Sequence, residues 1–191
     1  MNERTMLKEA LKGPAILWDR VRGQGIQVTA LWAADHLIRI VTGAPMQGVS
    51  QITPQLHVGG QYRQRGWQQL TSRGVTAVVN MRIELDDEAA SIAPQRYLYL
   101  PTVDDEPPSL EHLRAGVDFM AEEIRNGGAV YVHCGSGVGR APTMAAAYLV
   151  STGLALDEAW ARIRAVRPFI RPQPQQVARV KRFAEDLRSR D

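Results

Sequence analysis

Residues 130–144 read VYVHCGSGVGRAPTM, and this stretch decides both the fold and the chemistry that the sequence predicts. The apolar run at 129–133 predicts a buried strand, and the glycine-rich turn at 135–139 leads into a helix that begins near Arg140. Glycines let successive backbone N–H groups converge, and such a nest at a helix N-terminus binds anions. We therefore expect an anion site outside the carboxyl end of this strand.

Cys134 and Arg140 are the reactive side chains of this predicted site. Cys134 ends the strand at the mouth of the nest, where N–H groups and the helix dipole favour the nucleophilic thiolate. Arg140 lies six positions later and can fold back to present two N–H donors to phosphate oxygens. A thiolate beside an arginine fork predicts a phosphoryl-transfer site. We expect the His133 ring to donate to the loop backbone and hold the shape of the loop. The phosphate-binding residues would be Gly135, Ser136, Gly137, Val138, Gly139 and Arg140.

Strands and helices alternate on both sides of this stretch. Ser109 is the expected N-cap of a helix that ends before Gly127. Further strands are expected at 51–53, 56–58, 76–81 and 97–100. Further helices are expected at 63–72, 140–152, 156–166 and 174–189. This order predicts an α/β fold with a central, mostly parallel sheet flanked by helices.

Residues 1–48 look like an N-terminal helical extension, and the main domain spans residues 49–191. Residues 29–41 place apolar side chains on one side of a helical wheel, whereas Asp35, His36 and Arg39 share the other side. Such a helix either packs on the main domain or lies on a membrane surface. In the second case residues 14–41 would make a peripheral membrane contact.

The composition excludes several classes of protein. The chain has 191 residues, 23 Lys and Arg against 20 Asp and Glu, and one cysteine. A single cysteine excludes an intramolecular disulfide, and no apolar run reaches the roughly 18 residues of a membrane-spanning helix. No basic run alternates with aromatic residues, so nucleic acid is not an expected partner. Without a signal-peptide core or a cluster of metal ligands, we expect a cytoplasmic protein, peripheral at most to a membrane, that uses no metal or other cofactor.

The stretch 130–144 resembles the signature of the cysteine-based protein tyrosine phosphatases, in their dual-specificity branch. The resemblance covers residues of about 51–187. The runs Thr102–Asp104, Ser109–Leu113 and Arg164–Phe183 most resemble the mitochondrial-type phosphatidylglycerophosphate phosphatases, which are built like dual-specificity enzymes but act on a lipid phosphate. This resemblance implies a dual-specificity phosphatase fold and a catalytic domain over residues 49–191.

The resemblance also implies a role for each site residue. Cys134 would attack phosphorus and form a phosphocysteine intermediate, while Arg140 and the loop N–H groups hold the phosphate oxygens. Asp104 would protonate the leaving oxygen and later activate water, and Asp105 and Glu106 compete with it for this role. No metal would be required. The substrate would be a phosphorylated protein or an anionic phospholipid, such as phosphatidylglycerophosphate or a phosphoinositide.

Ala141 departs from the family pattern, because most members carry a Ser or Thr hydroxyl after the signature arginine. That hydroxyl stabilises the departing thiolate, so we expect slow hydrolysis of the phosphoenzyme here. A slow or inactive pseudophosphatase that binds phosphate as an interaction module is therefore the alternative. A sulfurtransferase is a third, since rhodanese-like domains also place a cysteine at a loop mouth. Arg167 and Arg171 either line a pocket for an anionic head group or pair with acidic residues.

Overall fold

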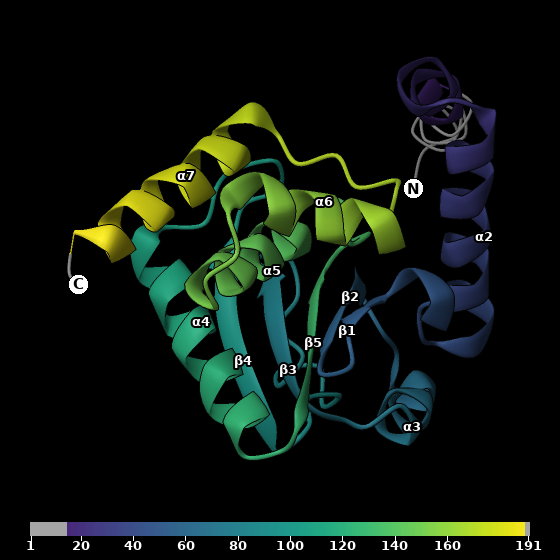
Figure 1. The fold of residues 1–191 in the computed structure, drawn as a ribbon. Coiled ribbons are helices and arrows are strands. Elements are labelled where there is room, and N and C mark those ends of the chain that lie inside the picture. Colours follow the sequence, from purple (N-terminus) through teal and green to yellow (C-terminus); the bar gives the residue numbers. More distant parts are fainter. Residues whose placement is uncertain (1–14, 190–191) are drawn as a thin grey trace.

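Residues 129–134 form the central strand of a five-stranded sheet, as a computed structural model of the chain shows for residues 15–189 (Figure 1). This strand, β5 (Ala129–Cys134), is buried along its whole length, which explains its continuous apolar sequence. It pairs in parallel with β2 (Leu56–Gly60) and with β3 (Val75–Arg82). At the edges, β4 (Arg96–Thr102) runs parallel to β3, and β1 (Gln51–Thr53) runs antiparallel to β2. The predicted α/β fold with a mostly parallel sheet is confirmed.

Helices cover both faces of the sheet, and alternate side chains of β5 point to the two layers. Val130 and Val132 join the larger core beneath the four C-terminal helices, whereas Tyr131 joins a smaller core beside α3. The C-terminal helices are α4 (Leu110–Arg125), α5 (Arg140–Ser151), α6 (Leu156–Val166) and α7 (Pro174–Arg188). On the other face lies α3 (Gln64–Ser72), α2 (Ile26–Thr42) contacts α3, and the short 3-10 helix η1 (Gln47–Val49) contacts β1.

The ends of the predicted elements agree with the structure to within a few residues. The Ser109 hydroxyl accepts a hydrogen bond from the His112 N–H at 3.0 Å, so the expected N-cap of α4 is confirmed. Gly74 follows α3 with a φ of 86°, a left-handed conformation that glycine adopts without a steric penalty. β2 and β4 are each longer than expected, and the extra residues of β2 are Gly59 and Gly60.

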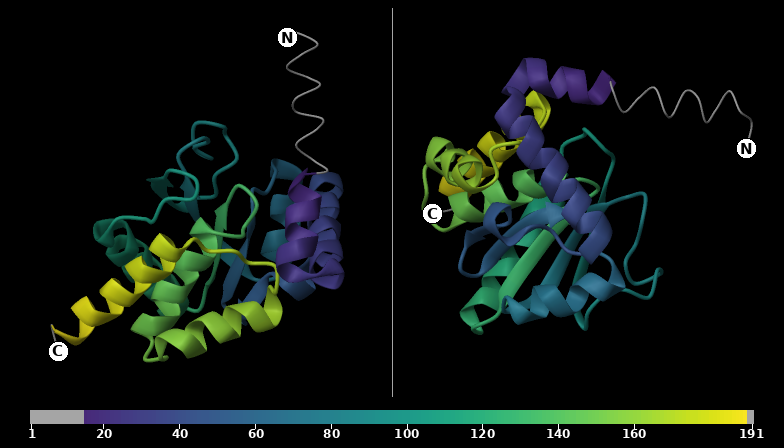
Figure 2. Two further views of the ribbon diagram at one scale, coloured as in Figure 1. Left: turned by 90° about the horizontal axis from the view of Figure 1, so that it is seen from above. Right: turned by 90° about the vertical axis from the view of Figure 1, so that its right-hand side faces the viewer.

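The N-terminal segment packs on the main domain through its polar side. Residues 15–24 are helical and cross the end of α2, as the right-hand view of Figure 2 shows. Asp35 and Arg39 are buried, with 2% and 9% of their surface exposed, whereas Leu37 and Val41 are 61% and 63% exposed. One of the two alternatives for this helix, packing on the main domain, is therefore observed. Asp35 and Arg39 face inward because the domain supplies partners for them, whereas Leu37, Ile40 and Val41 face outward.

Within the described residues, no helix combines the length and the apolar character that crossing a membrane requires.

Candidate active site

The loop after β5 holds its carbonyl groups outward, on donors from the surrounding chain. The Gly135 carbonyl accepts from the Gln61 N–H at 3.0 Å, and the Val138 carbonyl accepts from the Arg171 N–H at 2.7 Å. Between them, the Ser136 and Gly137 carbonyls accept from the Arg167 guanidinium at 3.1 and 2.7 Å. No described residue accepts a hydrogen bond from the backbone N–H groups of residues 135–140. This loop is therefore a nest of free donors at the N-terminus of α5, as an anion site requires.

Two glycines of the site are required by space and conformation. Gly137 has a φ of 70°, and a Cβ there would lie 2.3 Å from the backbone carbon of Gly59. A Cβ on Gly60 would lie 2.8 Å from the Gly135 carbonyl oxygen. Larger residues at either position would push β2 and the loop apart, so the close approach of these two segments fixes the shape of the nest.

Cys134 and Arg140 meet at this nest. Cys134 ends β5 and is 2% exposed, and Arg140 opens α5 and is also 2% exposed. A Cβ on Gly135 would lie 3.7 Å from Arg140 Nη2, so the guanidinium folds back over the start of the loop as expected. Arg140 Nη1 donates to the Thr102 carbonyl at 2.7 Å, which fixes the orientation of the fork. The arrangement places a nucleophile, a charged fork and free N–H groups around one small volume.

Asp104 is brought to the same place from β4, two strands away. Its Oδ1 lies 2.9 Å from Arg140 Nη2, and its side chain is 73% exposed. The neighbouring acids have other contacts: the Asp105 carboxylate, at a φ of 61°, accepts from the Gln173 side-chain amide, and the Glu106 backbone carbonyl accepts from the Gln176 side chain at 3.0 Å. Of the three expected candidates for the general acid, Asp104 is the one whose carboxylate contacts the arginine of the nest.

Glu84 is a site residue that the sequence analysis missed. Its two carboxylate oxygens lie 3.0 and 3.1 Å from Arg140 Nη1. Partial burial acts to raise the pKa of Glu84, but hydrogen bonds from Arg140 and from the backbone outweigh it, and the pKa is lowered. The ionised Glu84 therefore holds Arg140 in place. In the sequence this residue was one of eleven acids between residues 82 and 128, and nothing local distinguishes it.

His133 supports the loop by a different route from the one expected. Its ring makes no hydrogen bond to the loop backbone: Nε2 lies 2.8 Å from Asp87 Oδ2, and Nδ1 has no partner among the described residues. Asp87 Oδ1 in turn accepts from the Gln61 side-chain amide at 2.8 Å, and the Gln61 N–H donates to Gly135. The support passes through Asp87 and Gln61 because β5 pairs with β2, whose chain continues into Gln61.

Arg167 and Arg171 have different surroundings. Arg167 is fully buried and lies 3.2 Å from Asp35 Oδ2, so it pairs with an acid, as one of its two expected roles requires. Arg171 is 40% exposed, and its Nη1 lies 2.6 Å from Asp19 Oδ2. It lines a hollow of about 430 Å³ that adjoins the nest at Val138. The walls of this hollow are Asp19, Arg20, Asp105, Val138, Arg171, Pro172 and Gln173.

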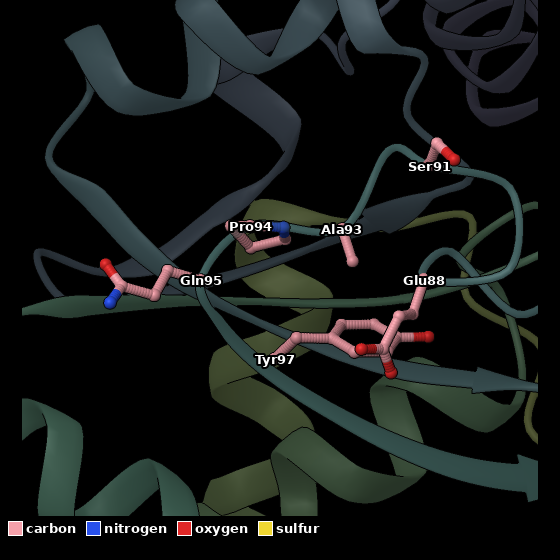
Figure 3. A pocket seen from close by; sticks show the side chains of 6 residues that line it. All are labelled: Glu88, Ser91, Ala93, Pro94, Gln95 and Tyr97. Carbon is pink, nitrogen blue, oxygen red and sulfur yellow. The ribbon is translucent and has the colours of Figure 1, made fainter.

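A second hollow, of about 330 Å³, shares no lining residue with the nest and is lined by residues between 88 and 97 (Figure 3). Its Tyr97 hydroxyl donates to Asp86 at 2.8 Å and accepts from the Asp87 N–H at 3.1 Å. These bonds fix the segment that carries Asp87, the partner of His133. Within the described residues, no group of three or more His, Cys, Asp or Glu is arranged to hold a metal ion.

Comparison with known proteins agrees with this geometry. Residues 56–186 match the family "Dual specificity phosphatase, catalytic domain", so residues 1–55 lie outside the match. Dual specificity protein phosphatase 14 of Mus musculus is 34% identical over 142 residues, which cover 70% of this chain and 68% of the relative. Dual specificity phosphatase 28 of Homo sapiens is 30% identical over 142 residues, with coverage of 73% and 79%.

Solved structures of related proteins share the fold. The crystal structure of PTPMT1 matches with a TM-score of 0.66 and 27% identity, and covers 74% of this chain and 96% of that chain. The structure of PTPMT1 in complex with PI(5)P matches with the same TM-score and identity, over 73% and 96%. A family match over more than half of the chain and these relatives lead to one conclusion: this chain belongs to the dual-specificity phosphatases and is a cysteine-dependent phosphatase.

Proposed function

We propose that this phosphatase hydrolyses a phosphate monoester through a phosphocysteine on Cys134, and that its substrate is a lipid phosphate in a membrane surface. The observation that carries the reaction is the nest itself. The six consecutive N–H groups of residues 135–140 have no acceptor among residues 15–189 and follow the strand end that carries Cys134, and Arg140 lies over the loop. These groups complement the three equatorial oxygens of a phosphoryl group in transfer, on which negative charge is spread.

The reaction has two steps. In the first, the Cys134 thiolate attacks phosphorus, the bond between phosphorus and the leaving oxygen breaks, and protonated Asp104 gives that oxygen its proton. In the second, the Asp104 carboxylate takes a proton from water, the water oxygen attacks phosphorus, and the phosphorus–sulfur bond breaks to return the thiolate. Arg140 and the N–H groups hold the phosphoryl oxygens in both steps. Inorganic phosphate and an alcohol are the products.

Carboxylates occupy the fork of Arg140 before substrate binds. Asp104 contacts Nη2 at 2.9 Å, and Glu84 contacts Nη1 at 3.0 Å. A phosphate that enters the nest must displace the Asp104 carboxylate from Arg140 Nη2. The exposed Asp104 is then free to swing toward the leaving oxygen, whereas Glu84 keeps its contact with Nη1. When the substrate phosphate replaces Asp104 at Arg140 Nη2, the same event therefore binds the substrate and frees the general acid.

Exposed apolar side chains favour a lipid substrate. Among the described residues, seven of the nine large apolar side chains with high exposure belong to residues 16–41. Ile26, Leu37 and Ile40 follow one side of α2, and Trp18 is 59% exposed on the helix before it. A stripe of this kind on the outside of a helix is the feature by which interfacial helices enter the head-group region.

The charge around this stripe fits an anionic lipid surface better than a second copy of the chain. No acidic residue occurs between residues 36 and 83, whereas five arginines do. Two of them, Arg63 and Arg65, are exposed beside the end of α2, where the Arg65 guanidinium donates to the Ile40 carbonyl. Like-charged faces repel each other, while anionic head groups attract basic residues near the surface. The similarity to PTPMT1, of which one structure holds PI(5)P, supports the same substrate class.

The reaction is tested first with p-nitrophenyl phosphate. We expect turnover by the wild type, inhibition by vanadate, no turnover by Cys134→Ser, and slower turnover by Asp104→Asn, which lacks the general acid. Turnover that survives Cys134→Ser contradicts the nucleophile assignment, and tight phosphate binding without turnover by the wild type indicates the pseudophosphatase alternative. Thiosulfate-dependent sulfur transfer would instead support the rhodanese-like alternative.

The substrate is tested by comparing kcat/KM for phosphatidylglycerophosphate and a phosphoinositide in vesicles with kcat/KM for phosphotyrosine and phosphothreonine peptides. We expect the lipids to be preferred, and a preference for the peptides overturns the lipid proposal. For membrane contact, Leu37→Asp should weaken sedimentation with anionic vesicles. Gln27→Asp, which adds the same charge at an exposed position of α2, is the control. If the wild type is a dimer and Leu37→Asp makes it monomeric, a second copy of the chain covers the stripe instead.

A further inference from the structure

Arg20 carries a buried positive charge, and no carboxylate accepts a hydrogen bond from it among the described residues. Only 7% of its surface is exposed, its guanidinium lies 4.2 Å from the centre of the Trp32 ring, and its closest hydrogen-bond acceptor is Gln24 Oε1 at 3.4 Å. Its Nε has no partner among the described residues. Burial and then the charge of Arg171 lower the pKa of Arg20 to about 10, and the charge of Asp19 opposes this. A buried cation with so few acceptors is costly unless an anion joins it.

This guanidinium lines the hollow that adjoins the nest. Arg171 lines the same hollow, and its backbone N–H is bonded to Val138 of the catalytic loop. The Gln24 side chain donates to the Ile170 carbonyl at 3.1 Å, which ties the helix that carries Arg20 to the segment that carries Arg171. Both arginines are therefore fixed relative to the phosphate-binding loop.

The hollow adjoins the segment that carries Asp104. Asp105 forms part of its wall and is the neighbour of Asp104, which contacts Arg140 in the nest. If a phosphoryl group sits in the nest, the leaving oxygen faces Asp104, and the next part of the substrate extends toward the hollow. A second anionic group on the leaving alcohol would meet two guanidinium groups there.

We propose that Arg20 and Arg171 form a second anion subsite, which binds a phosphodiester carried by the alcohol that leaves. The substrate class is a phosphate monoester joined through a polyol to a phosphodiester, as in the head group of a phosphorylated glycerophospholipid. Asp19, which is 67% exposed and paired with Arg171, occupies the subsite until the phosphodiester displaces it. This inference rests on the proposed phosphatase reaction and adds Arg20 and Asp19, which lie outside the matched family domain, to Arg171, which lies within it.

The test uses soluble head groups, so membrane binding does not enter the result. For each enzyme we compare kcat/KM for glycerophosphoglycerol phosphate, which has a monoester and a diester, with kcat/KM for glycerol 3-phosphate, which has the monoester alone. A second pair, glycerophosphoinositol 5-phosphate and inositol 5-phosphate, has a longer bridge. In the wild type we expect the diester to raise kcat/KM. We call the kcat/KM of the compound with the diester, divided by the kcat/KM of the compound without it, the diester ratio. From the typical strength of a charged hydrogen bond, we expect Arg20→Gln to lower this ratio about 10- to 100-fold.

Asp19→Asn changes an exposed residue, and we expect it to raise the diester ratio that Arg20→Gln lowers. It removes the carboxylate that competes with the phosphodiester, so the ratio should rise a few-fold. Arg22→Gln is the matched control, because Arg22 is exposed on the same helix and contacts the Trp18 ring, outside the hollow. It should leave the ratio unchanged.

The outcomes separate this inference from the proposed reaction. A lower diester ratio in Arg20→Gln than in the wild type, for either substrate pair, supports the subsite. The pair with the larger decrease identifies the length of bridge that fits. A ratio that Arg20→Gln and Asp19→Asn both leave at the wild-type value overturns the subsite while glycerol 3-phosphate is still hydrolysed. If the wild type hydrolyses none of the four compounds and no p-nitrophenyl phosphate, the proposed reaction itself fails.

Discussion

Asp35 lies in α2 of the N-terminal segment. Asp35→Asn should nevertheless destabilise the protein far more than a substitution at an exposed position of a helix. Asp35 is 2% exposed and Arg167 is fully buried, with Asp35 Oδ2 and Arg167 Nη2 3.2 Å apart. Burial lowers the pKa of Arg167, and the charge of Asp35 is the strongest factor that opposes this. The neutral amide leaves a buried guanidinium without its counterion. Loss of one partner of a buried ion pair costs about 3–5 kcal/mol.

That cost is a large share of the total, because domains are stable by only about 5–15 kcal/mol. At about 2–4 °C per kcal/mol for a chain of this size, the Tm should fall by roughly 6–20 °C. Urea unfolding of wild type and variant measures the free energy directly. Asp118→Asn, the same change at an exposed position of α4, is the control and should stay within about 0.5 kcal/mol of wild type.

A catalytic readout separates the effect on the loop from the loss of stability. Arg167 also donates to the Ser136 and Gly137 carbonyls, so its displacement disturbs the nest. At a temperature where Asp35→Asn remains folded, kcat/KM for p-nitrophenyl phosphate should still be reduced. The double variant Asp35→Leu with Arg167→Met should show a coupling energy of about 1–3 kcal/mol relative to the two single variants. A loss below about 1 kcal/mol in Asp35→Asn, or no coupling, refutes the reasoning.

Three further outcomes are expected. Ala141→Ser should shorten the life of the phosphoenzyme and raise the steady-state rate after the burst, and an unchanged steady-state rate contradicts the role given to the missing hydroxyl. Burial, and then the charge of Arg73, lower the pKa of His57, so the folded protein disfavours its protonation. Unfolding free energy should therefore fall as the pH drops below about 6.5, by at most about 1.4 kcal/mol per unit for one group, and His57→Gln should flatten that slope in urea titrations. Peroxide should inactivate the enzyme by oxidising Cys134 without an internal disulfide, and mass spectrometry of a protein that retains activity with Cys134 oxidised would contradict this.

The sequence predicted those parts of the site that are contiguous in the chain. The apolar strand, the glycine turn and the helix start all lie within residues 129–144, and local physics decides each of them. The supporting acids could not be predicted in the same way. Glu84 and Asp87 become partners of Arg140 and His133 only because β3 and β5 are neighbours in the sheet. In the sequence they are members of an acid-rich segment that resembles an ordinary solvated loop.

The orientation of α2 shows a second limit of sequence patterns. Periodicity separates a polar from an apolar side of a helix, but it does not say which side is buried. Apolar burial is the usual outcome, because transfer from water favours it at about 25 cal/mol per Å². Here Asp35 is bonded to the Met46 N–H and to Arg167, and Arg39 donates to the Gln61 carbonyl. These bonds compensate the desolvation of the polar side and leave the apolar side outside.

The same bonds make the N-terminal segment a part of the active site. Asp35 reaches the loop carbonyls through Arg167, and Arg39 bonds to Gln61, whose N–H holds the Gly135 carbonyl. Arg20 adds a wall to the hollow beside the loop. A segment that served only to attach the enzyme to a membrane would have no reason to bury its charges against the catalytic loop. The exposed apolar side chains of α2 face outward while Asp35 and Arg39 bond to the loop and its supports, so the proposed contact with a lipid surface and the geometry of the nest would depend on opposite sides of one helix. A lipid bound as proposed would therefore act on an element that is joined by hydrogen bonds to the loop after β5.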